Sequence, residues 1–284
     1  MLGDFDYVRA GSVEEACALL AENEGARILA GGTDLLVNVR NRIISPALLV
    51  DIKGIPELGE LSLEDGMRIG AAVPLNVVAE NNKIRKGYPA LAEAAGAVGS
   101  YQVRNRATLA GNLGNASPAA DTAPPLFVLN AQVEIAGAGG TRTLPVCDLL
   151  VGVKRTSLDR GEMITAIVLP PTRGARSAFL KKQRIKGHDL AVVNMAGFYD
   201  PSTGKLRVAI GSCAVTPVLL PSLPEPVRGD DPLDEVVAEL DRIAQEAVRP
   251  IDDLRGSAEY RRAMITVYLR RLMEALLERK PDGA

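Results

Sequence analysis

The spacing of apolar and polar residues at the start of the chain predicts a helix followed by strands. Ser12 and Glu15 have the spacing of a helix-capping box, and the apolar residues after them recur at helical intervals up to Gly25. The short apolar stretches 27–30 and 48–52 have the length and composition of buried strands. Together these elements predict a small unit of the βαβ type, with a pair of glycines in the turn after its first strand.

The middle of the chain predicts several short strands and one helix. Each strand candidate is a short run rich in apolar residues, and these runs lie at 67–71, 132–135, 141–144 and 164–169. The Ala-rich segment 89–98 has the composition of a helix. The segment 102–121 is rich in Asn, Gly and Ala, so we expect it to be a loop within a mixed α+β region.

A new pattern begins after Pro170-Pro171. It predicts antiparallel strands at 178–181, 192–199 and 206–210. A Pro-rich connection then leads to two helices, and the last one has Ser257 at its start and an apolar face made of Ile265, Leu269, Leu272, Met273 and Leu276. These patterns predict three units: 1–57, 58–172, and 173–284 with an antiparallel sheet and helices.

Composition and charge exclude several classes of protein. Hydrophobic residues make up 47% of the chain and charged residues 24%, as in ordinary globular proteins. The net charge of -2, with Lys and Arg spread along the chain, argues against a nucleic-acid partner. No stretch approaches the roughly 18 apolar residues of a membrane span, and residues 1–5 lack the features of a signal peptide. We therefore expect a cytoplasmic location and no membrane span.

Cysteine and histidine offer little for metal or acid–base chemistry. Cys17, Cys147 and Cys213 are far apart, without the spacing of an iron–sulfur or zinc site, so we expect no metal in this chain. His188 is the only histidine and lies outside both candidate binding segments described next. We assign it no catalytic role, and we expect no catalytic residue elsewhere.

The first candidate binding segment is Leu-Ala-Gly-Gly-Thr-Asp-Leu at 29–35. Gly31 and Gly32 leave backbone N–H groups accessible to an anion such as a phosphate, although the pair could also serve only to make a sharp turn. A P-loop is excluded because no Lys-Ser/Thr follows the glycines, and a classical dinucleotide-binding turn because the G-x-G-x-x-G spacing is missing.

The second candidate segment runs from Gln102 to Asp121. Small residues alternate with side chains that form hydrogen bonds, which suits a segment wrapped around a large polar ligand. Asp121 could accept hydrogen bonds from sugar hydroxyl groups or could organise the loop. The alternative for the whole segment is a rigid crossover whose side chains satisfy one another.

Together the two segments resemble the paired FAD motifs of the flavoprotein (medium) subunits of xanthine dehydrogenase and carbon monoxide dehydrogenase. Ala-Gly-Gly-Thr-Asp-Leu-Leu at 30–36 precedes the longer motif at 102–121, in the order of the family, and the resemblance extends over essentially the whole chain. It implies an α+β protein. An FAD-binding fold of the vanillyl alcohol oxidase and p-cresol methylhydroxylase type, with two α+β subdomains, would be followed by a smaller α+β domain of the CO dehydrogenase flavoprotein type.

The resemblance also implies which residues contact FAD. Backbone N–H groups of 30–34 would bind the pyrophosphate, the second segment would line the adenosine and ribitol side, and Ile164 and Lys181 would lie near the flavin ring. A cation there would favour the anionic reduced flavin, although Lys181 or Lys182 could instead be solvated. The full set is Leu29, Ala30, Gly31, Gly32, Thr33, Asp34, Leu35, Thr108, Ala110, Gly111, Asn112, Asn115, Ser117, Asp121, Ile164 and Lys181. Ala107 and Ala110 replace glycines usual in the family, so we expect a stiffer or slightly displaced loop.

The function implied by the resemblance is an electron relay. Non-covalently bound FAD would receive electrons from a [2Fe-2S] subunit, supplied by a molybdenum-cofactor subunit that hydroxylates the substrate, and pass them to an external acceptor such as NAD or a quinone. Molybdopterin and [2Fe-2S] clusters would sit only in these partners, in a dimer of heterotrimers. The alternatives are a self-sufficient FAD-dependent oxidase or dehydrogenase of the same fold and a non-enzymatic nucleotide-binding or assembly protein.

Overall fold

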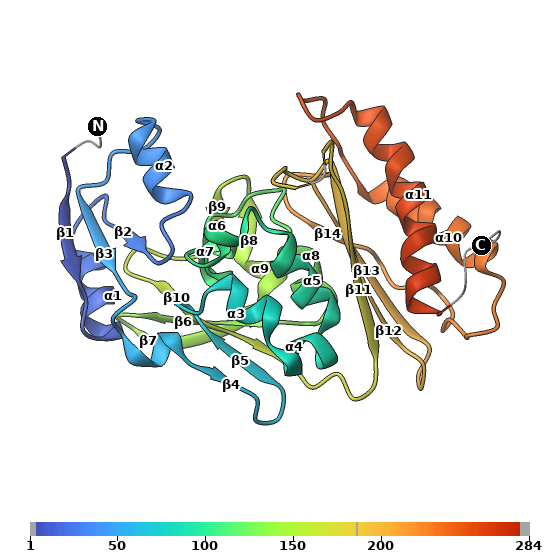
Figure 1. Cartoon of the computed structure of the whole chain (residues 1–284), viewed down its shortest axis with the longest axis horizontal. Coiled ribbons are helices and arrows are strands. Elements are labelled where there is room, and N and C mark those ends of the chain that lie inside the picture. The colour runs from blue at the N-terminus through green and yellow to red at the C-terminus, as the bar shows by residue number, and fades with distance from the viewer. Residues whose placement is uncertain (1–3, 186, 279–284) are drawn as a thin grey trace.

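The computed structural model describes residues 4–185 and 187–278. Residues 1–3, on which the expectation about a signal peptide partly rests, lie outside this range. The three larger sheets follow one another along the long axis, in the order in which the chain builds them (Figure 1). No helix within the described ranges is both long enough and apolar enough to cross a membrane.

The first sheet confirms the expected βαβ-type unit and adds a strand to it. Its strands are parallel in the order β1-β3-β2. The Ser12 hydroxyl accepts a hydrogen bond from Glu15 N at 3.2 Å and so caps the first helix, as the capping spacing predicted. The elements are β1 (Asp6–Arg9), α1 (Val13–Glu22), β2 (Arg27–Leu29), α2 (Leu35–Arg40) and β3 (Leu48–Asp51).

The second sheet contains every strand that the pattern predicted for the middle of the chain. It is antiparallel throughout, in the order β4-β5-β10-β6-β7. Its strands are β4 (Leu61–Ser62), β5 (Met67–Gly70), β6 (Gln132–Gly137), β7 (Gly140–Pro145) and β10 (Met163–Leu169).

Short helices are far more numerous in this region than expected, and the expectation of a loop over 102–121 is wrong. The side chains of Ser100 and Thr108 accept hydrogen bonds from Val103 N (3.3 Å) and Gly111 N (3.0 Å), and each thereby starts a helix too short to show a hydrophobic period. The helices are α3 (Leu75–Glu80), α4 (Asn82–Gly87), α5 (Pro89–Ala97), α6 (Tyr101–Arg104), α7 (Leu109–Gly114), α8 (Ala123–Val128) and α9 (Val146–Leu149), with the 3-10 helix η1 (Pro56–Gly59) and the hairpin strands β8 (Leu150–Gly152) and β9 (Arg155–Thr156).

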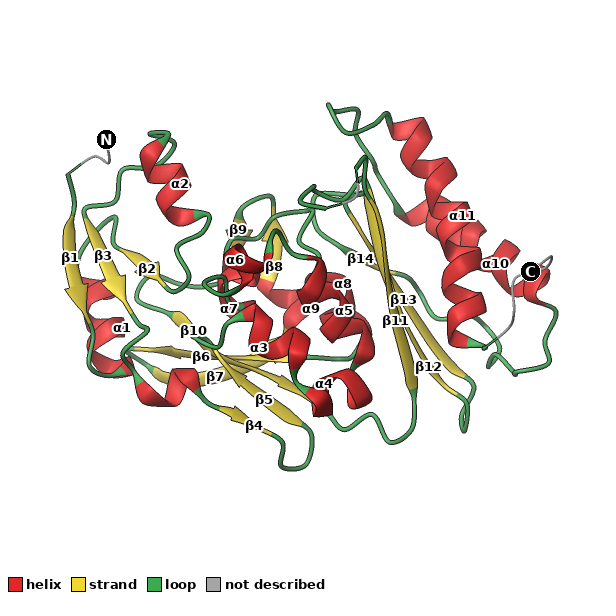
Figure 2. Ribbon diagram, viewed as in Figure 1, coloured by secondary structure: helices red, strands yellow, loops and turns green. Residues whose placement is uncertain are grey.

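The third sheet is a layer between two sets of helices (Figure 2). One face packs against α5 and α8, and the other against α11, beside which α10 packs. Gly197 allows the close approach of α11, because a Cβ atom there would lie 2.5 Å from Leu276 Cδ1. The elements, which match the predicted antiparallel pattern, are β11 (Arg176–Lys182), β12 (Val193–Asp200), β13 (Lys205–Gly211), β14 (Val218–Leu219), α10 (Leu233–Ala247) and α11 (Ala258–Leu276).

Two clusters of buried apolar side chains hold these layers together. The larger cluster runs through both N-terminal sheets and includes Phe179, Ala196 and Ala209 from the third sheet. The smaller one lies between the third sheet and helices α10 and α11, and it includes all five apolar residues predicted for the face of α11. The N-terminal sheets therefore share a core, and the division at 57/58 and 172/173 stays a prediction.

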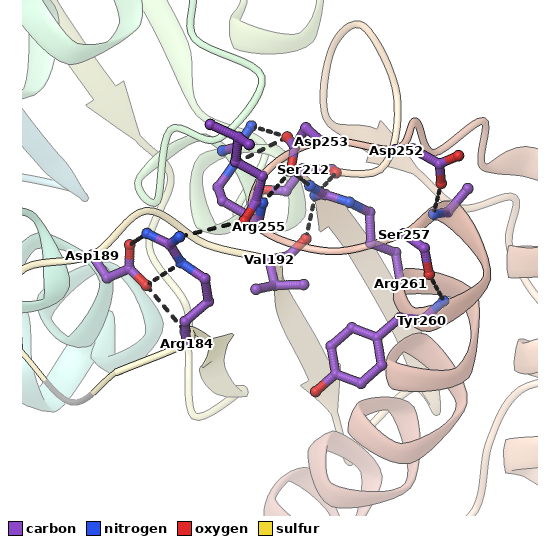
Figure 3. A network of polar contacts seen from close by, with 12 residues as sticks. Arg184, Asp189, Val192, Ser212, Asp252, Asp253, Arg255, Ser257, Tyr260 and Arg261 are labelled. Atoms are coloured by element: carbon purple, nitrogen blue, oxygen red, sulfur yellow. Dashed lines mark hydrogen bonds and ion pairs between the residues drawn. The ribbon is translucent and has the colours of Figure 1, made fainter.

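A buried arginine fastens α11 to the third sheet (Figure 3). Arg261 is 1% exposed and donates hydrogen bonds to the carbonyl oxygens of Val192 (2.6 Å) and Ser212 (2.9 Å). Its guanidinium also pairs with Asp253 at 2.6 Å. One side chain thus connects the start of β12, the end of β13 and the turn before α11.

Candidate functional site

The two candidate binding segments, 29–35 and 102–121, lie against each other. A Cβ atom on Gly31 would lie 2.1 Å from the carbonyl oxygen of Arg106, so only glycine permits this contact between backbones. Asn115 Nδ2 donates a hydrogen bond to Asp34 Oδ2 at 2.9 Å across the same junction. Segments distant in sequence therefore form one surface.

The turn in the first segment presents unpaired backbone donors. Within the described ranges, the N–H groups of Gly31, Gly32, Thr33 and Asp34 donate to no acceptor of the protein. Consecutive unpaired N–H groups in a turn form a concave site for an anion. Gly32 has a φ of +73°, and a Cβ atom there would lie 2.8 Å from Leu29 Cδ1, so this glycine is required by the turn itself rather than to clear space for a ligand.

Side chains of the second segment are largely engaged with the segment itself. Thr108 is buried and caps α7, Asn112 Oδ1 accepts from the Thr122 hydroxyl at 2.7 Å, and Ser117 Oγ accepts from Ala119 N at 3.3 Å. Gly111, by contrast, is exposed at the start of α7. The N–H of Gly111 is used by this cap, so the remaining amide hydrogens of Asn112 are better placed to meet a ligand than the Gly111 backbone or the hydroxyl groups are.

Asp121 and Lys181 form a buried ion pair. Their charged atoms are 2.7 Å apart, and each side chain is 7% exposed. Asn194 Nδ2 also donates to the Asp121 carboxylate at 2.9 Å, and Lys181 Nζ donates to the carbonyl oxygen of Ala97 at 3.1 Å. Burial raises the pKa of the Asp121 carboxyl group, and the ammonium and amide beside it oppose this rise. Of the two roles considered for Asp121, this geometry favours organising the segment over binding a sugar.

A cavity of about 470 Å³ opens beside this ion pair. It lies between the end of α5, helix α6 and the segment after β11, and its lining comprises Gly96, Ala97, Gly99, Ser100, Tyr101, Arg104, Lys181, Gln183, Gly187 and His188. Lys181 lines it and Lys182 does not. His188 borders it although the residue lies outside both motifs, and Tyr101 and Arg104 were also not among the expected contacts. Only tertiary structure brings these side chains together.

The remaining expected contacts surround the junction of the two segments. Leu29, Ala30 and Ala110 are buried, and Leu35 begins α2. Ile164 is buried on β10, against which α7 packs, at an irregularity in its pairing with β6. Among residues 4–185 and 187–278, no group of three or more His, Cys, Asp and Glu side chains could hold a metal ion.

Two family descriptions together cover nearly the whole chain. The family described as "FAD binding domain in molybdopterin dehydrogenase" matches residues 3–172, and "CO dehydrogenase flavoprotein C-terminal domain" matches residues 178–276. The chain therefore belongs to the family of FAD-binding subunits of molybdopterin dehydrogenases. The predicted α+β fold with a CO dehydrogenase flavoprotein C-terminal domain is therefore confirmed, as is FAD as its cofactor.

Relatives named as subunits of dehydrogenases agree with this assignment over nearly their full length. The glyceraldehyde dehydrogenase medium chain of Sulfolobus acidocaldarius is 30% identical, over 93% of this chain and 95% of the relative. The carbon monoxide dehydrogenase medium chain of Afipia carboxidovorans is 32% identical, over 96% of each. The structure of carbon monoxide dehydrogenase from Hydrogenophaga pseudoflava has a TM-score of 0.91 at 30% identity, covering 99% of this chain and 100% of that one. This molybdenum-hydroxylase flavoprotein is thus an oxidoreductase subunit.

The observed site fits FAD. The unpaired N–H groups of residues 31–34 suit the anionic pyrophosphate, and the cavity beside Lys181 is large enough for part of a planar ring system. The prediction of a flavoprotein medium subunit therefore agrees with the geometry as well as with the relatives.

Proposed function

We propose that this subunit relays electrons, through FAD held between its two binding segments, from a [2Fe-2S] subunit to an external acceptor such as NAD or a quinone. The observation that supports this most is the junction of the two segments, where Gly31 packs on Arg106 and the N–H groups of 31–34 have no acceptor among the described residues. Bound FAD would supply the redox chemistry. The residues of this chain would bind the cofactor, orient it and shape access to it.

The contacts with FAD follow from the position of each group. Backbone N–H groups of 31–34 would bind the pyrophosphate, with Leu29, Ala30 and Leu35 supporting the turn. Gly111, Asn112 and Asn115, with Thr108, Ala110 and Ser117 behind them, would line the adenosine and ribitol side. The ring would extend toward Ile164 and the cavity, with Lys181 at its edge. Because the negative charge of Asp121 compensates the positive charge of Lys181, this ion pair would mainly fix the shape of that end of the site.

The partners belong to the same proposal. Relatives of this chain are subunits of multi-subunit enzymes, and several are named as medium chains. We propose a molybdenum-cofactor subunit and a [2Fe-2S] subunit as its partners, in a cytoplasmic dimer of heterotrimers. Hydroxylation of the substrate would occur on the molybdenum subunit, so no residue of this chain needs to act on the substrate.

Reconstitution tests the relay against the self-sufficient alternative. The chain would be purified with and without the two partner subunits, and flavin absorbance would be followed after addition of a substrate of the molybdenum subunit. We expect bleaching of the flavin only in the complete complex, with bound molybdenum and iron. Steady oxidation of an organic substrate by the FAD-loaded chain alone would contradict the relay and favour a self-sufficient flavoenzyme.

A further inference from the structure

Lys154 lies between β8 and β9, outside both binding segments. Figure 1 labels the two strands of this hairpin. Its backbone N–H donates to the carbonyl oxygen of Ala116 at 2.9 Å, and its ammonium group donates to Asn115 Oδ1 at 3.0 Å. Main chain and side chain therefore both attach the hairpin to the residues that follow α7.

The amide of Asn115 lies between a cation and an anion. Its oxygen accepts from Lys154, and its nitrogen donates to Asp34 Oδ2 at 2.9 Å. The reversed amide would point its oxygen at the Asp34 carboxylate and its NH₂ group at the ammonium, and both contacts would be repulsive. The two charges fix the orientation of Asn115, and a single amide group separates the ammonium from the first binding segment.

Lys154 differs from the other lysines near the site in the partner of its ammonium group. Lys53 lies 2.7 Å from Asp51, and Lys181 lies 2.7 Å from Asp121, so a carboxylate matches each of these cations. Among the described residues, no carboxylate lies within ion-pairing distance of the Lys154 ammonium, whose bonded partner is the neutral amide of Asn115. Lys154 therefore contributes a positive charge that has no direct ion-pair partner, and the Asp34 carboxylate lies on the far side of the Asn115 amide.

We propose that Lys154 is a cofactor-positioning residue, whose ammonium neutralises the pyrophosphate of FAD and holds Asn115 in its binding orientation. This inference rests on the proposed binding of the pyrophosphate at residues 31–34. Backbone donors supply directed hydrogen bonds to an anion, and a nearby cation adds an attraction that depends on net charge and is weakened by salt. The hairpin then acts as a third element of the site, in addition to the two motifs.

The conformation of Lys154 determines which variants are informative. Its φ is +57°, a left-handed conformation that β-branched residues adopt least readily, and Lys, Met and Arg are all unbranched at Cβ. Lys154→Met and Lys154→Arg therefore share the backbone cost and differ in charge. Lys83→Met removes an exposed lysine of α4 and serves as the control.

The test measures ligand binding rather than turnover. The full chain, with the subunits that co-purify with it, would be freed of flavin and titrated with FAD, ADP and riboflavin at low and high salt. Lys154→Met should lower the affinity for FAD and for ADP about tenfold at low salt and by less at high salt, as loss of one charge-assisted contact predicts. The affinity for riboflavin, which lacks phosphate, should fall much less than the affinity for FAD. Lys154→Arg should restore most of the affinity, and Lys83→Met should change nothing.

Two outcomes would overturn the inference without touching the proposed function. In one, Lys154→Met binds FAD as tightly as the unaltered chain and with the same salt dependence. In the other, Lys154→Met loses riboflavin as strongly as FAD, which would indicate a general structural role. Failure of the unaltered complex to bind FAD would instead overturn the proposed function and the inference with it.

Discussion

The Lys181 ammonium lies 2.7 Å from the Asp121 carboxylate, and this pair connects the second binding segment to the third sheet. Lys181 comes from β11, whereas Asp121 immediately precedes the turn into α8. Asn194 on β12 also donates to Asp121. Three elements therefore meet at one carboxylate beside the cavity, and the pair is both a structural contact and a wall of the site.

We predict that Lys181→Met destabilises the chain by about 3 kcal/mol, because removing one member of a buried ion pair leaves the other charge uncompensated. The measurement is chemical unfolding of the purified protein. Asp121→Asn would be the partner variant, and the double variant Lys181→Met/Asp121→Asn should recover part of the loss. Additive losses in the double variant would show that the two side chains do not stabilise each other.

The same variant should show a characteristic dependence on pH. Burial raises the pKa of Asp121 in the folded state above its pKa in the unfolded state. At a pH between these two pKa values, the folded chain therefore binds more protons than the unfolded chain does. The contribution of this carboxyl group to stability therefore falls as the pH rises through that window. Lys181→Met raises the folded pKa further, so its destabilisation should be largest at neutral pH and should shrink on acidification. A loss independent of pH would indicate that packing, and not charge, is responsible.

A second prediction concerns the contact between the two segments. Gly31→Ala should separate them, because the new Cβ would lie 2.1 Å from a backbone oxygen that no side-chain rotation can move. We expect loss of bound FAD together with a loss of about 2 kcal/mol or more in unfolding free energy, the range for steric overpacking. Gly59→Ala is the matched control, since nothing lies within 4 Å of its added Cβ. Full retention of FAD by Gly31→Ala after dialysis would refute this role.

Sequence patterns predicted the long strands and the two C-terminal helices, because their apolar faces repeat over several turns or alternations. Ile265, Leu269 and Leu272, for example, are all buried on α11. Helices α6 and α7 contain four and six residues and depend on the caps Ser100 and Thr108, so no periodic signal marks them.

The binding segments were recognisable because each is local in sequence, whereas the contacts around them are not. Lys181 and Asp121 are 60 residues apart, and Lys154 and Asn115 are 39 apart. Tertiary packing alone determines that these side chains meet. For the same reason His188 was assigned to no site, although it lines the cavity.

We predict that FAD is bound without a covalent link. Cys17 and Cys213 are buried, and Cys147 on α9 is not among the residues that line the cavity. His188 does line the cavity and is the side chain that would form such a link. Acid precipitation should release all the yellow colour into the supernatant. Colour retained by the precipitate, and lost in His188→Ala, would identify a histidyl attachment instead.

The last prediction concerns Arg261, which holds the turn before α11 against the ends of β12 and β13. Arg261→Met keeps much of the apolar stem but leaves the carbonyl oxygens of Val192 and Ser212, and the carboxylate of Asp253, without this donor. The unpaired buried acceptors and the broken ion pair together should lower the free energy of unfolding by about 3 kcal/mol or more.

The comparison that isolates this effect uses Arg271 on the same helix. Arg271 is exposed, and its Cζ atom lies 5.2 Å from the centre of the Tyr268 ring. Arg271→Met should therefore lower the free energy of unfolding by only about 0.5 kcal/mol. Hydrogen exchange should show faster exchange at the ends of β12 and β13 in Arg261→Met, because their connection to α11 is released first. If both variants unfolded alike, the buried guanidinium would contribute no more than an exposed one, and its role in fastening α11 to the sheet would be wrong.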